Sequence, residues 1–406
     1  MTGGRALRIL FVVRPISVHA ARWINQVADE GWDLHVFPAH EGAWHPDFRD
    51  VTAYDLDRCH GQRPNPRMRS RVLWPLPFAS DRMRMVGARL SERWSSRAAW
   101  LARVVRWLKP DLVHSLEFQQ AGYLTLRSRS FYEGRFPPWA VTNWGSDIYL
   151  FGPLPGHAEK IRGVLAGCDY YACECERDVA LAREYGFRGE ALPVVPIAGG
   201  FHVEKMRQYR EPGPTSARRV IALKGYQHWA GRSLFGLRAV ELCADAIKAG
   251  GYRVAIYLAD EDVRVAAERM SLRTGVPVEI IPPGPHEEML RLHGRARVSV
   301  GLSISDGLST SALEAMLMGS FPVQSDTSCL GELVSDGETA LMVPPEDPGV
   351  IAAAITRAIT DDALVDRAAE LNARTAAERL DYQTVRSKAV AMYEHMASRG
   401  RVVNET

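Results

Sequence analysis

The sequence lacks long hydrophobic runs. Apolar residues make up 46% of its 406 residues, yet no stretch approaches the ~20 consecutive apolar residues of a membrane-spanning helix. The first apolar segment, residues 7–13, is short and is followed by Arg14-Pro15, so it predicts neither a signal peptide nor a membrane anchor. We therefore expect a soluble or peripheral protein, and the length favours two domains over one.

An excess of one charge is missing as well. The formal net charge is +2 and charged residues make up 24% of the chain, which is ordinary for a globular protein and argues against nucleic acid as a partner. Lysine is scarce, with 6 lysines against 44 arginines. We attribute this imbalance to genomic base composition, so it carries no functional information.

Cysteine is rare, and its spacing does not suit a metal. The six cysteines are residues 59, 168, 173, 175, 243 and 329. None forms the Cys-x2-Cys pair that is typical of zinc sites. Cys173 and Cys175 would share one face of a strand, and the acidic run Asp260-Glu261-Asp262 is interpreted as a helix cap. We expect no metal site, and unpaired cysteines favour a reducing, cytoplasmic location.

Internal repeats and low-complexity tracts are absent, and strands alternate with helices instead. The first series has expected strands over residues 7–13, 34–37, 112–115, 139–142, 170–173 and 192–195, with a helix over 19–30. The second has expected strands over 219–223, 252–258, 278–281, 298–304, 321–324 and 340–343, and helices over 233–249, 262–274, 348–360, 361–379 and 382–398. A polar segment with Pro212, Gly213 and Pro214 separates them. The predicted parts are an N-terminal domain 1–202, a linker 203–218, a C-terminal domain 219–380 and a final helical segment 381–406.

The segment of residues 305–323 carries the strongest functional signal. An apolar strand runs into a short polar loop, and a helix begins at the hydroxyl cluster of residues 309–311. The N–H groups and the positive dipole end at such a helix start favour an anionic ligand. Glu314 is placed in the first turn of the helix, Asp306 lies eight residues earlier, and Gly319 closes the helix.

This pattern resembles the signature of family 4 glycosyltransferases, which are retaining enzymes of the GT-B fold. Their signature has two acids separated by seven residues, then Ala-Met, Gly and an apolar-Pro-Val strand, and residues 306–323 follow it. The first acid is usually Glu and is Asp306 here. The resemblance implies an α/β protein with two Rossmann-like, doubly wound domains facing across a cleft. It also implies that Asp306 lies near the transferred sugar and that Glu314 holds the nucleotide ribose. The implied contacts to the rest of the donor are Gly307, Leu308, Ser309 and Thr310.

Two basic residues follow the first strand of the second series. Lys224-Gly225 comes directly after it, and Arg232 begins the next helix. Family members place an Arg and then a Lys at this point, so the order is reversed here. The resemblance implies that Lys224 and Arg232 act catalytically by stabilising the leaving diphosphate, with Gly225 against the donor. The alternative, two surface cations flanking a turn, stays open. Further along, Glu287 and Glu288 are interpreted as acids that cap a helix start.

Residues 142–147 of the first series resemble a family motif of His, Gly, any residue and Asp, with Trp144 in the place of His. The resemblance implies that Trp144 and Asp147 contact the sugar or the acceptor, although Asp147 equally suits a helix cap. Ser17 and His19 follow the first strand and are further candidate acceptor contacts. Many relatives carry glycines there and this chain does not, and Ser17 is also a good helix N-cap.

A basic, tryptophan-rich segment precedes this motif. Residues 58–109 hold 13 basic and 2 acidic residues and four tryptophans. Apolar residues at near-helical spacing alternate with arginines, which is typical of helices that bind an anionic membrane surface. We hypothesise peripheral membrane contact through residues 63–109. The alternative is a helix packed on its own sheet with a solvated arginine face.

The sequence therefore predicts a hexosyltransferase-like enzyme. It would move a sugar from a nucleoside-diphosphate sugar, bound by the C-terminal domain, to a hydroxyl of a glycan, lipid or small-molecule acceptor, bound by the N-terminal domain. No cofactor besides this donor substrate is expected, and the location is cytoplasmic, extending to the inner face of the plasma membrane. Two alternatives stay open, namely a GT-B sugar-nucleotide epimerase and a non-catalytic nucleotide-sugar-binding partner of another transferase.

Overall fold

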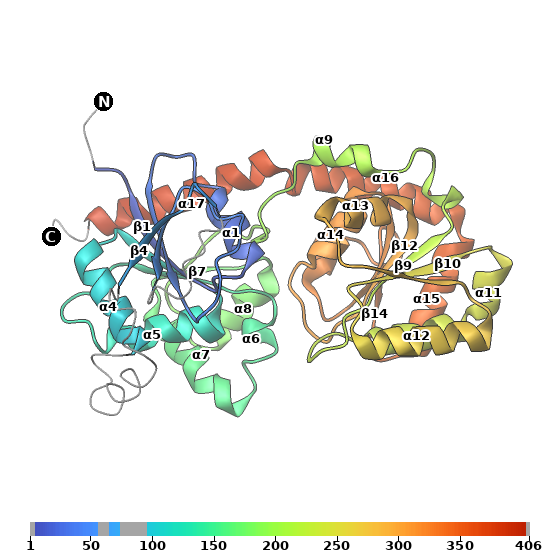
Figure 1. The fold of residues 1–406 in the computed structure, drawn as a ribbon, viewed down its shortest axis with the longest axis horizontal. Coiled ribbons are helices and arrows are strands. Elements are labelled where there is room, and N and C mark those ends of the chain that lie inside the picture. Colours follow the sequence, from blue (N-terminus) through green and yellow to red (C-terminus); the bar gives the residue numbers. More distant parts are fainter. Residues whose placement is uncertain (1–4, 56–64, 74–95, 403–406) are drawn as a thin grey trace. The chain divides into compact units, whose positions relative to one another are not determined.

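The computed structural model describes residues 5–55, 65–73 and 96–402. The chain divides into two compact units (Figure 1). The N-terminal unit comprises the residues up to Gly199 together with those from Val385 onward, and the C-terminal unit comprises Gly200–Thr384. None of the described helices is both long and apolar enough to cross a bilayer.

The N-terminal unit is built on an eight-stranded sheet in the order β4-β3-β2-β1-β5-β6-β7-β8, in which each described ladder is parallel. The strands are β1 (Arg8–Val13), β2 (Asp33–Pro38), β3 (Thr52–Asp55), β4 (Arg69–Val72), β5 (Leu112–Leu116), β6 (Trp139–Thr142), β7 (Tyr170–Ala172) and β8 (Glu190–Ala191). The central strands are buried along almost their whole length because both faces of a parallel sheet are covered by helices.

The helical segments of this unit are α1 (Val18–Asn25), α4 (Arg97–Leu108), a π-helical turn η2 (Phe118–Gly122), α5 (Tyr123–Arg129), α6 (Ser146–Tyr149), α7 (Pro155–Gly167), α8 (Glu176–Glu184) and, from Val385 onward, α17 (Tyr382–Val402). Helices α1 and α17 lie on one side of the sheet, and α4, α5 and α7 lie on the other (Figure 1). The Trp23 indole N–H donates to the Tyr393 hydroxyl at 2.8 Å, and this hydroxyl lies 2.8 Å from His114 Nδ1. The last helix is thus anchored on the first sheet.

The C-terminal unit has a six-stranded parallel sheet in the order β11-β10-β9-β12-β13-β14. Its strands are β9 (Val220–Lys224), β10 (Arg253–Tyr257), β11 (Val278–Ile281), β12 (Ala296–Gly301), β13 (Phe321–Ser325) and β14 (Leu341–Val343). The longer helices are α10 (Ser233–Leu242), α11 (Ala244–Ala249), α12 (Glu261–Thr274), α13 (His286–Arg295), α14 (Thr310–Leu317), α15 (Pro348–Thr360) and α16 (Asp362–Arg379). Short helical turns are α9 (Val203–Met206), η3 (Arg207–Tyr209), η4 (Thr215–Ala217) and η5 (Cys329–Glu332).

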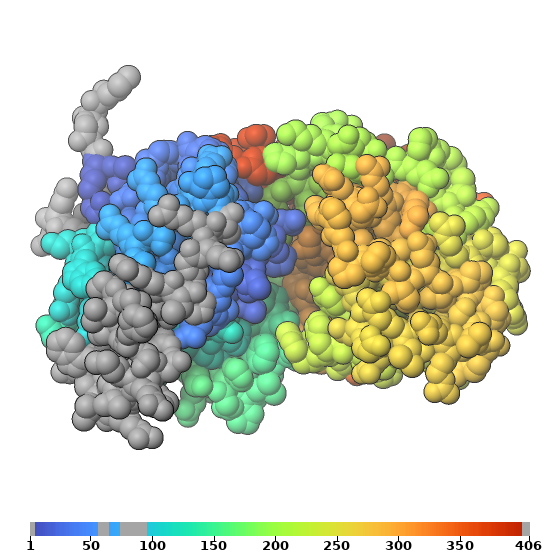
Figure 2. Space-filling model, in the orientation of Figure 1, coloured from blue at the N-terminus to red at the C-terminus, as the bar shows by residue number. Residues whose placement is uncertain are grey.

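Alternate residues of the central strand β9 pack on opposite sides of this sheet. Ile221 and Leu223 join the larger core with α10, α12 and α15, whereas Val220 and Ala222 pack with Leu292 of α13. Figure 1 shows α12 and α15 on one side of the sheet and α13 on the other. Residues 282–288, which lead into and begin α13, form part of the unit's outer surface (Figure 2), and all of them are exposed.

Several predicted boundaries are wrong. The first helix ends at Asn25 instead of residue 30, and residues 192–195 are not a strand, since the edge strand is β8 just before them. The predicted helix over 233–249 is broken at Cys243 into α10 and α11. The strand β12 ends at Gly301, three residues earlier than predicted. The predicted linker, residues 203–218, contains α9, η3 and η4.

Candidate functional site

Helix α14 begins where the sequence predicts, after the loop of residues 302–309 that follows the carboxyl end of β12. Ser309 occupies the N-cap position with φ −56° and ψ 112°, but no side chain in the described residues caps the helix. The first intrahelical acceptor is the Ser309 carbonyl, which receives the N–H groups of Ala312 and Leu313. The amides of Ser309, Thr310 and Ser311 have no acceptor in the described part of the chain. Such a helix start is suited to an anionic ligand.

Glu314 is the fifth residue of α14, so its predicted place in the first turn is wrong. It lies one turn deeper and is only 6% exposed. Its Oε1 atom lies 2.5 Å from Nε2 of His286, the first residue of α13. Burial raises the pKa of the neighbouring Tyr257 hydroxyl, and Glu314 adds to this shift. The carboxylate is therefore held inside the site.

Asp306 lies in the loop before α14, partly buried. Its Oδ1 accepts a hydrogen bond of 3.0 Å from the Gly307 amide, so this amide already has an acceptor within the protein. The Gly307 carbonyl accepts from the Cys329 amide at 3.0 Å, and Leu308 is buried. Asp306 also contributes to raising the pKa of the Tyr226 hydroxyl, for which burial is the larger cause. The loop is thus held in a fixed shape beside Tyr226.

Lys224 and Gly225 lie at the carboxyl end of β9. The Lys224 Nζ atom lies 4.6 Å from the centre of the Tyr226 ring, and Lys224 makes no ion pair with any described residue. Gly225 is buried, and a Cβ atom there would lie 2.5 Å from the Ala259 Cα atom. The glycine is therefore required by the close approach of the loop after β10.

Arg232 begins α10 as its N-cap residue, and its guanidinium is already paired. The Nε atom lies 2.6 Å from Glu346 Oε1, and Nη1 donates to the Gly231 carbonyl at 2.9 Å. The Arg232 side chain is 18% exposed and the Glu346 side chain is 54% exposed. An anionic ligand that binds Arg232 would compete with the Glu346 carboxylate.

We expect Glu346→Gln to tighten donor binding by about two- to fivefold, because it removes a surface carboxylate worth about 0.2–1 kcal/mol to Arg232. Calorimetric titration with the nucleoside diphosphate that the protein prefers would measure this. Glu338→Gln is the matched control, since it removes an exposed partner of another arginine, Arg367. Unchanged or weaker binding in Glu346→Gln alone would contradict a role of Arg232 in anion binding.

The N-terminal unit gathers four predicted residues at the carboxyl edge of its own sheet. The rings of His19 and Trp144 meet edge to face with their centres 5.9 Å apart. Asp147 Oδ2 accepts 3.0 Å hydrogen bonds from the amides of Phe118 and Trp144. The Ser17 hydroxyl accepts a hydrogen bond from the Ala20 amide. Ser17 is therefore the N-cap of α1, which was the alternative to a role in acceptor binding. The Trp144 indole N–H is buried and has no acceptor in the structure's described residues.

Glu117 is a residue of this edge that the sequence analysis missed. It directly follows β5 and has φ 92° and ψ 160°, a region that non-glycine residues rarely adopt. It is 4% exposed, and its Oε1 accepts from the amides of Gln120 and Ala121 at the start of the π-helical turn η2. Its position after a strand was the available signal, but a backbone conformation leaves no trace in the residue type.

Glu117 and Asp147 are neighbouring buried acids that resist ionisation together. Burial raises the pKa of Glu117 to about 7, although the bonded amides and Arg14 oppose the shift. Burial, and then the charge of Glu117, raise the pKa of Asp147 well above its usual value. The pair therefore retains a proton near neutral pH. It can then both donate hydrogen bonds to hydroxyl groups and accept hydrogen bonds from them.

We expect Glu117→Gln to become more stable relative to the wild type as pH rises from about 4.5 to 7, by on the order of 2–3 kcal/mol. The raised pKa means that the folded protein binds the proton more tightly than the unfolded chain, so its stabilising effect is present below pH 4.5 and is lost towards pH 7. Urea unfolding of both proteins across this range measures the difference. Buried His114 and His293, whose pKa values are lowered to about 3 and about 4, are common to both proteins and cancel. If the free energy of unfolding of the two proteins varies with pH in the same way, the raised pKa of Glu117 is contradicted.

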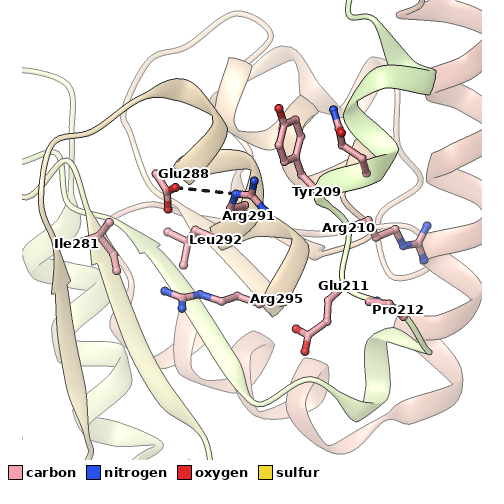
Figure 3. A pocket seen from close by; sticks show the side chains of 10 residues that line it. Tyr209, Arg210, Glu211, Pro212, Ile281, Glu288, Arg291, Leu292 and Arg295 are labelled. Atoms are coloured by element: carbon pink, nitrogen blue, oxygen red, sulfur yellow. Dashed lines mark ion pairs between the residues drawn. The ribbon is translucent and has the colours of Figure 1, made fainter.

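A cavity of about 470 Å³ also lies in the C-terminal unit, between α13 and the linker. Arg291, Leu292 and Arg295 of α13 line it, together with residues 208–212 (Figure 3). Glu288 pairs with Arg291 at 3.9 Å, as the dashed line in Figure 3 shows. None of its lining residues belongs to the loop before α14, so this cavity is separate from the predicted donor site.

Two segments of the chain match protein families. Residues 258–376 match the family described as glycosyl transferases group 1, and residues 87–174 match the family described as glycosyl transferase 4-like. The first match contains Asp306, Glu314 and all of α14, and the second contains Glu117 and Asp147. The matches support the transferase class that the sequence predicts, and the finer assignment to family 4 remains a prediction.

Curated relatives match over short segments. The chain is 33% identical over 114 residues to an MMP alpha-(1->4)-mannosyltransferase of Mycolicibacterium hassiacum, covering 28% of this chain and 28% of that protein. It is 36% identical over 112 residues to a glycogen synthase of Mycobacterium tuberculosis, covering 27% of this chain and 26% of that protein. The match thus spans little more than a quarter of each relative.

Solved structures match over nearly the whole chain. Anabaena Alr3699/HepE in complex with UDP-glucose has a TM-score of 0.67 at 13% identity, covering 95% of this chain and 99% of that one. Sucrose-phosphate synthase from Thermosynechococcus elongatus has a TM-score of 0.66 at 16% identity, covering 97% and 100%. The predicted fold class is confirmed: the chain has the GT-B fold, with two parallel-sheet α/β domains.

Proposed function

We propose that this protein is a retaining glycosyltransferase that moves a sugar from a nucleoside-diphosphate sugar to an acceptor hydroxyl. One observation carries the proposal: an uncapped helix start and a buried carboxylate, Glu314, lie together inside the segment that matches glycosyl transferases group 1. Amides that lack an acceptor suit a diphosphate, and a carboxylate suits the hydroxyls of a ribose. The arrangement suits one molecule that contains both groups.

The chemistry needs charge stabilisation at the leaving group. As the acceptor oxygen bonds to the anomeric carbon, the bond from this carbon to the diphosphate breaks, and the acceptor proton passes to a diphosphate oxygen on the same face. Lys224, Arg232 and the amides at the start of α14 stabilise the charge that develops on the diphosphate. Asp306 lies near the sugar, and Trp144 and Asp147, with Glu117 beside them, bind hydroxyls of the acceptor. No metal is required in this scheme.

UDP-sugars are the first candidates to test as the donor substrate. A structural neighbour was solved in complex with UDP-glucose, and relatives by sequence are named as a mannosyltransferase and a glycogen synthase. A thermal-shift panel of UDP-, GDP- and ADP-sugars identifies the base, because a ligand that binds the folded state raises the melting temperature. Slow hydrolysis of the preferred donor would separate a transferase from a non-catalytic binder. The absence of a shift with every donor would overturn the proposal.

We also propose that the N-terminal unit meets an anionic membrane surface near a lipid-linked acceptor. Helix α4 buries its apolar side in the core and carries Trp100, Arg103, Arg106 and Trp107, of which Trp107 is 62% exposed. Arg103 lies over the Trp100 ring at 4.6 Å. Tryptophan and arginine together favour the interface of an anionic bilayer. Much of the predicted segment, residues 63, 64 and 74–95, lies outside the described residues. Co-sedimentation with vesicles that contain or lack anionic lipid tests this proposal, and equal, negligible binding would overturn it.

A further inference from the structure

We infer that His286 is the positioning residue for the donor nucleoside: it holds one oxygen of the Glu314 carboxylate and thereby leaves the other for the ribose hydroxyls. The inference rests on the proposed function, because it concerns the same donor site. It adds a residue that the matched signature of residues 306–323 does not contain.

The Glu314 carboxylate is buried, and its two oxygens have different surroundings. Its Oε1 lies 2.5 Å from His286 Nε2, whereas Oε2 has no hydrogen-bond partner in the described part of the chain. The oxygen that lies away from His286 therefore keeps its capacity to accept hydrogen bonds from a ligand. Two adjacent hydroxyl groups of a ribose would supply the missing donors. The half-satisfied carboxylate therefore points to a ligand with hydroxyl groups.

Helix α13 carries two histidines, and only one suits this role. His293 is 1% exposed, and its Nδ1 lies 2.9 Å from the Ser299 hydroxyl. Burial lowers the pKa of His293 to about 4, so it is neutral and belongs to the core. The side chain of His286 is 42% exposed, and it lies at the first position of the helix. His286 is thus the histidine that contacts both Glu314 and the surface of the site.

The backbone before His286 restricts its position. Residues 282–285 read Pro-Pro-Gly-Pro and connect the carboxyl end of β11 to α13. Each proline fixes its φ angle, and Pro285 is the N-cap residue with φ −57° and ψ 151°. A histidine fixed in this way orients a carboxylate with little loss of conformational freedom on ligand binding. The rigidity supports a positioning role.

The test compares binding of the preferred nucleoside diphosphate with that of its 2′-deoxy and 3′-deoxy forms, by calorimetric titration. We expect His286→Ala to weaken the ribonucleotide about tenfold, since a hydrogen bond to a charged group is lost. We expect at most a twofold effect on the deoxy form that lacks the hydroxyl bound by Glu314. His286→Gln, which keeps an N–H donor, should bind within about threefold of the wild type. At saturating donor, kcat should change little while KM for the donor rises.

A matched control is His395→Ala. His395 Nε2 lies 2.7 Å from Glu190 Oε1, and its side chain is also 42% exposed, but the pair lies in the N-terminal unit. This variant should bind every nucleotide like the wild type. Equal binding by His286→Ala and the wild type, or equal losses for the ribo and deoxy forms, would overturn the inference. If the wild type binds no nucleoside diphosphate, the proposed function itself fails, which is a different result.

Discussion

Glu314→Ala should lose most donor binding and turnover, with kcat/KM reduced on the order of 100-fold. The variant removes a buried acceptor for two ribose hydroxyls, and each hydrogen bond to a charged group contributes about 1.5–3 kcal/mol. The loss should appear chiefly as weaker binding of the nucleoside part. Calorimetric titration with the nucleoside diphosphate, the nucleoside monophosphate and inorganic pyrophosphate measures this directly. The first two should bind more weakly, and pyrophosphate should be nearly unaffected.

Two variants separate a binding role of Glu314 from a structural one. Glu314→Gln keeps the shape and one hydrogen-bond acceptor, so it should retain more affinity than Glu314→Ala and melt near the wild-type temperature. Glu338→Ala removes an exposed glutamate of the same unit that pairs with Arg367, and it should behave as the wild type does. If Glu314→Ala binds the nucleoside diphosphate with wild-type affinity, the assigned role of Glu314 is wrong.

The helix start at the proposed donor site could be predicted from sequence because it lies in one continuous segment. A strand, a polar loop, a hydroxyl cluster and a glycine follow one another within residues 296–319, and local chemistry decides where a helix begins and ends. The prediction placed the start of α14 at residues 309–311 and its end at Gly319, which has φ 74°. Glu314 was assigned one turn too early, because the first turn of a helix that begins at Thr310 comprises residues 310–313.

The partners of these residues could not be predicted, because tertiary contacts join them. His286 and Glu314 are 28 residues apart, and Arg232 and Glu346 are 114 apart. The sequence indicated only that acids begin α13 and that a cation begins α10. Which carboxylate meets which cation depends on the crossover connections of the sheet. Pairing of exposed side chains also contributes little free energy, so no sequence pattern reflects it.

The N-terminal sheet shows a second reason why parts of the structure could not be predicted from sequence. Strands β3 and β4 were missed because they are only four residues long, and β4 is exposed throughout. Glu117 was missed because its place beside Asp147 depends on an unusual backbone angle and on tertiary packing. Trp144 and Asp147 were predicted as candidate contacts because a motif contains them. Motifs record residue types, whereas strain and burial arise from packing.

Lys224→Ala should weaken binding of the diphosphate part of the donor, whereas Glu314→Ala should weaken binding of the nucleoside part. The Lys224 ammonium lies over Tyr226 and has no ion pair in the structure's described residues, so its charge is available for the diphosphate. We expect kcat/KM to fall about 100- to 1000-fold, because a charge that stabilises the leaving group acts in the transition state. Binding of pyrophosphate and the nucleoside diphosphate should weaken, whereas binding of the nucleoside should not change.

Conservative and control variants decide whether the charge itself matters. Lys224→Arg keeps the charge and should recover part of the activity, whereas Lys224→Met keeps the length and should not. Lys248→Ala removes a lysine of the same unit that pairs with Asp245 on the surface, and it should have no effect. Because Glu314 would bind the nucleoside and Lys224 the diphosphate, their losses should be separable ligand by ligand. If both variants weaken every ligand equally, the two residues support the fold of the site instead of contacting different ends of one donor.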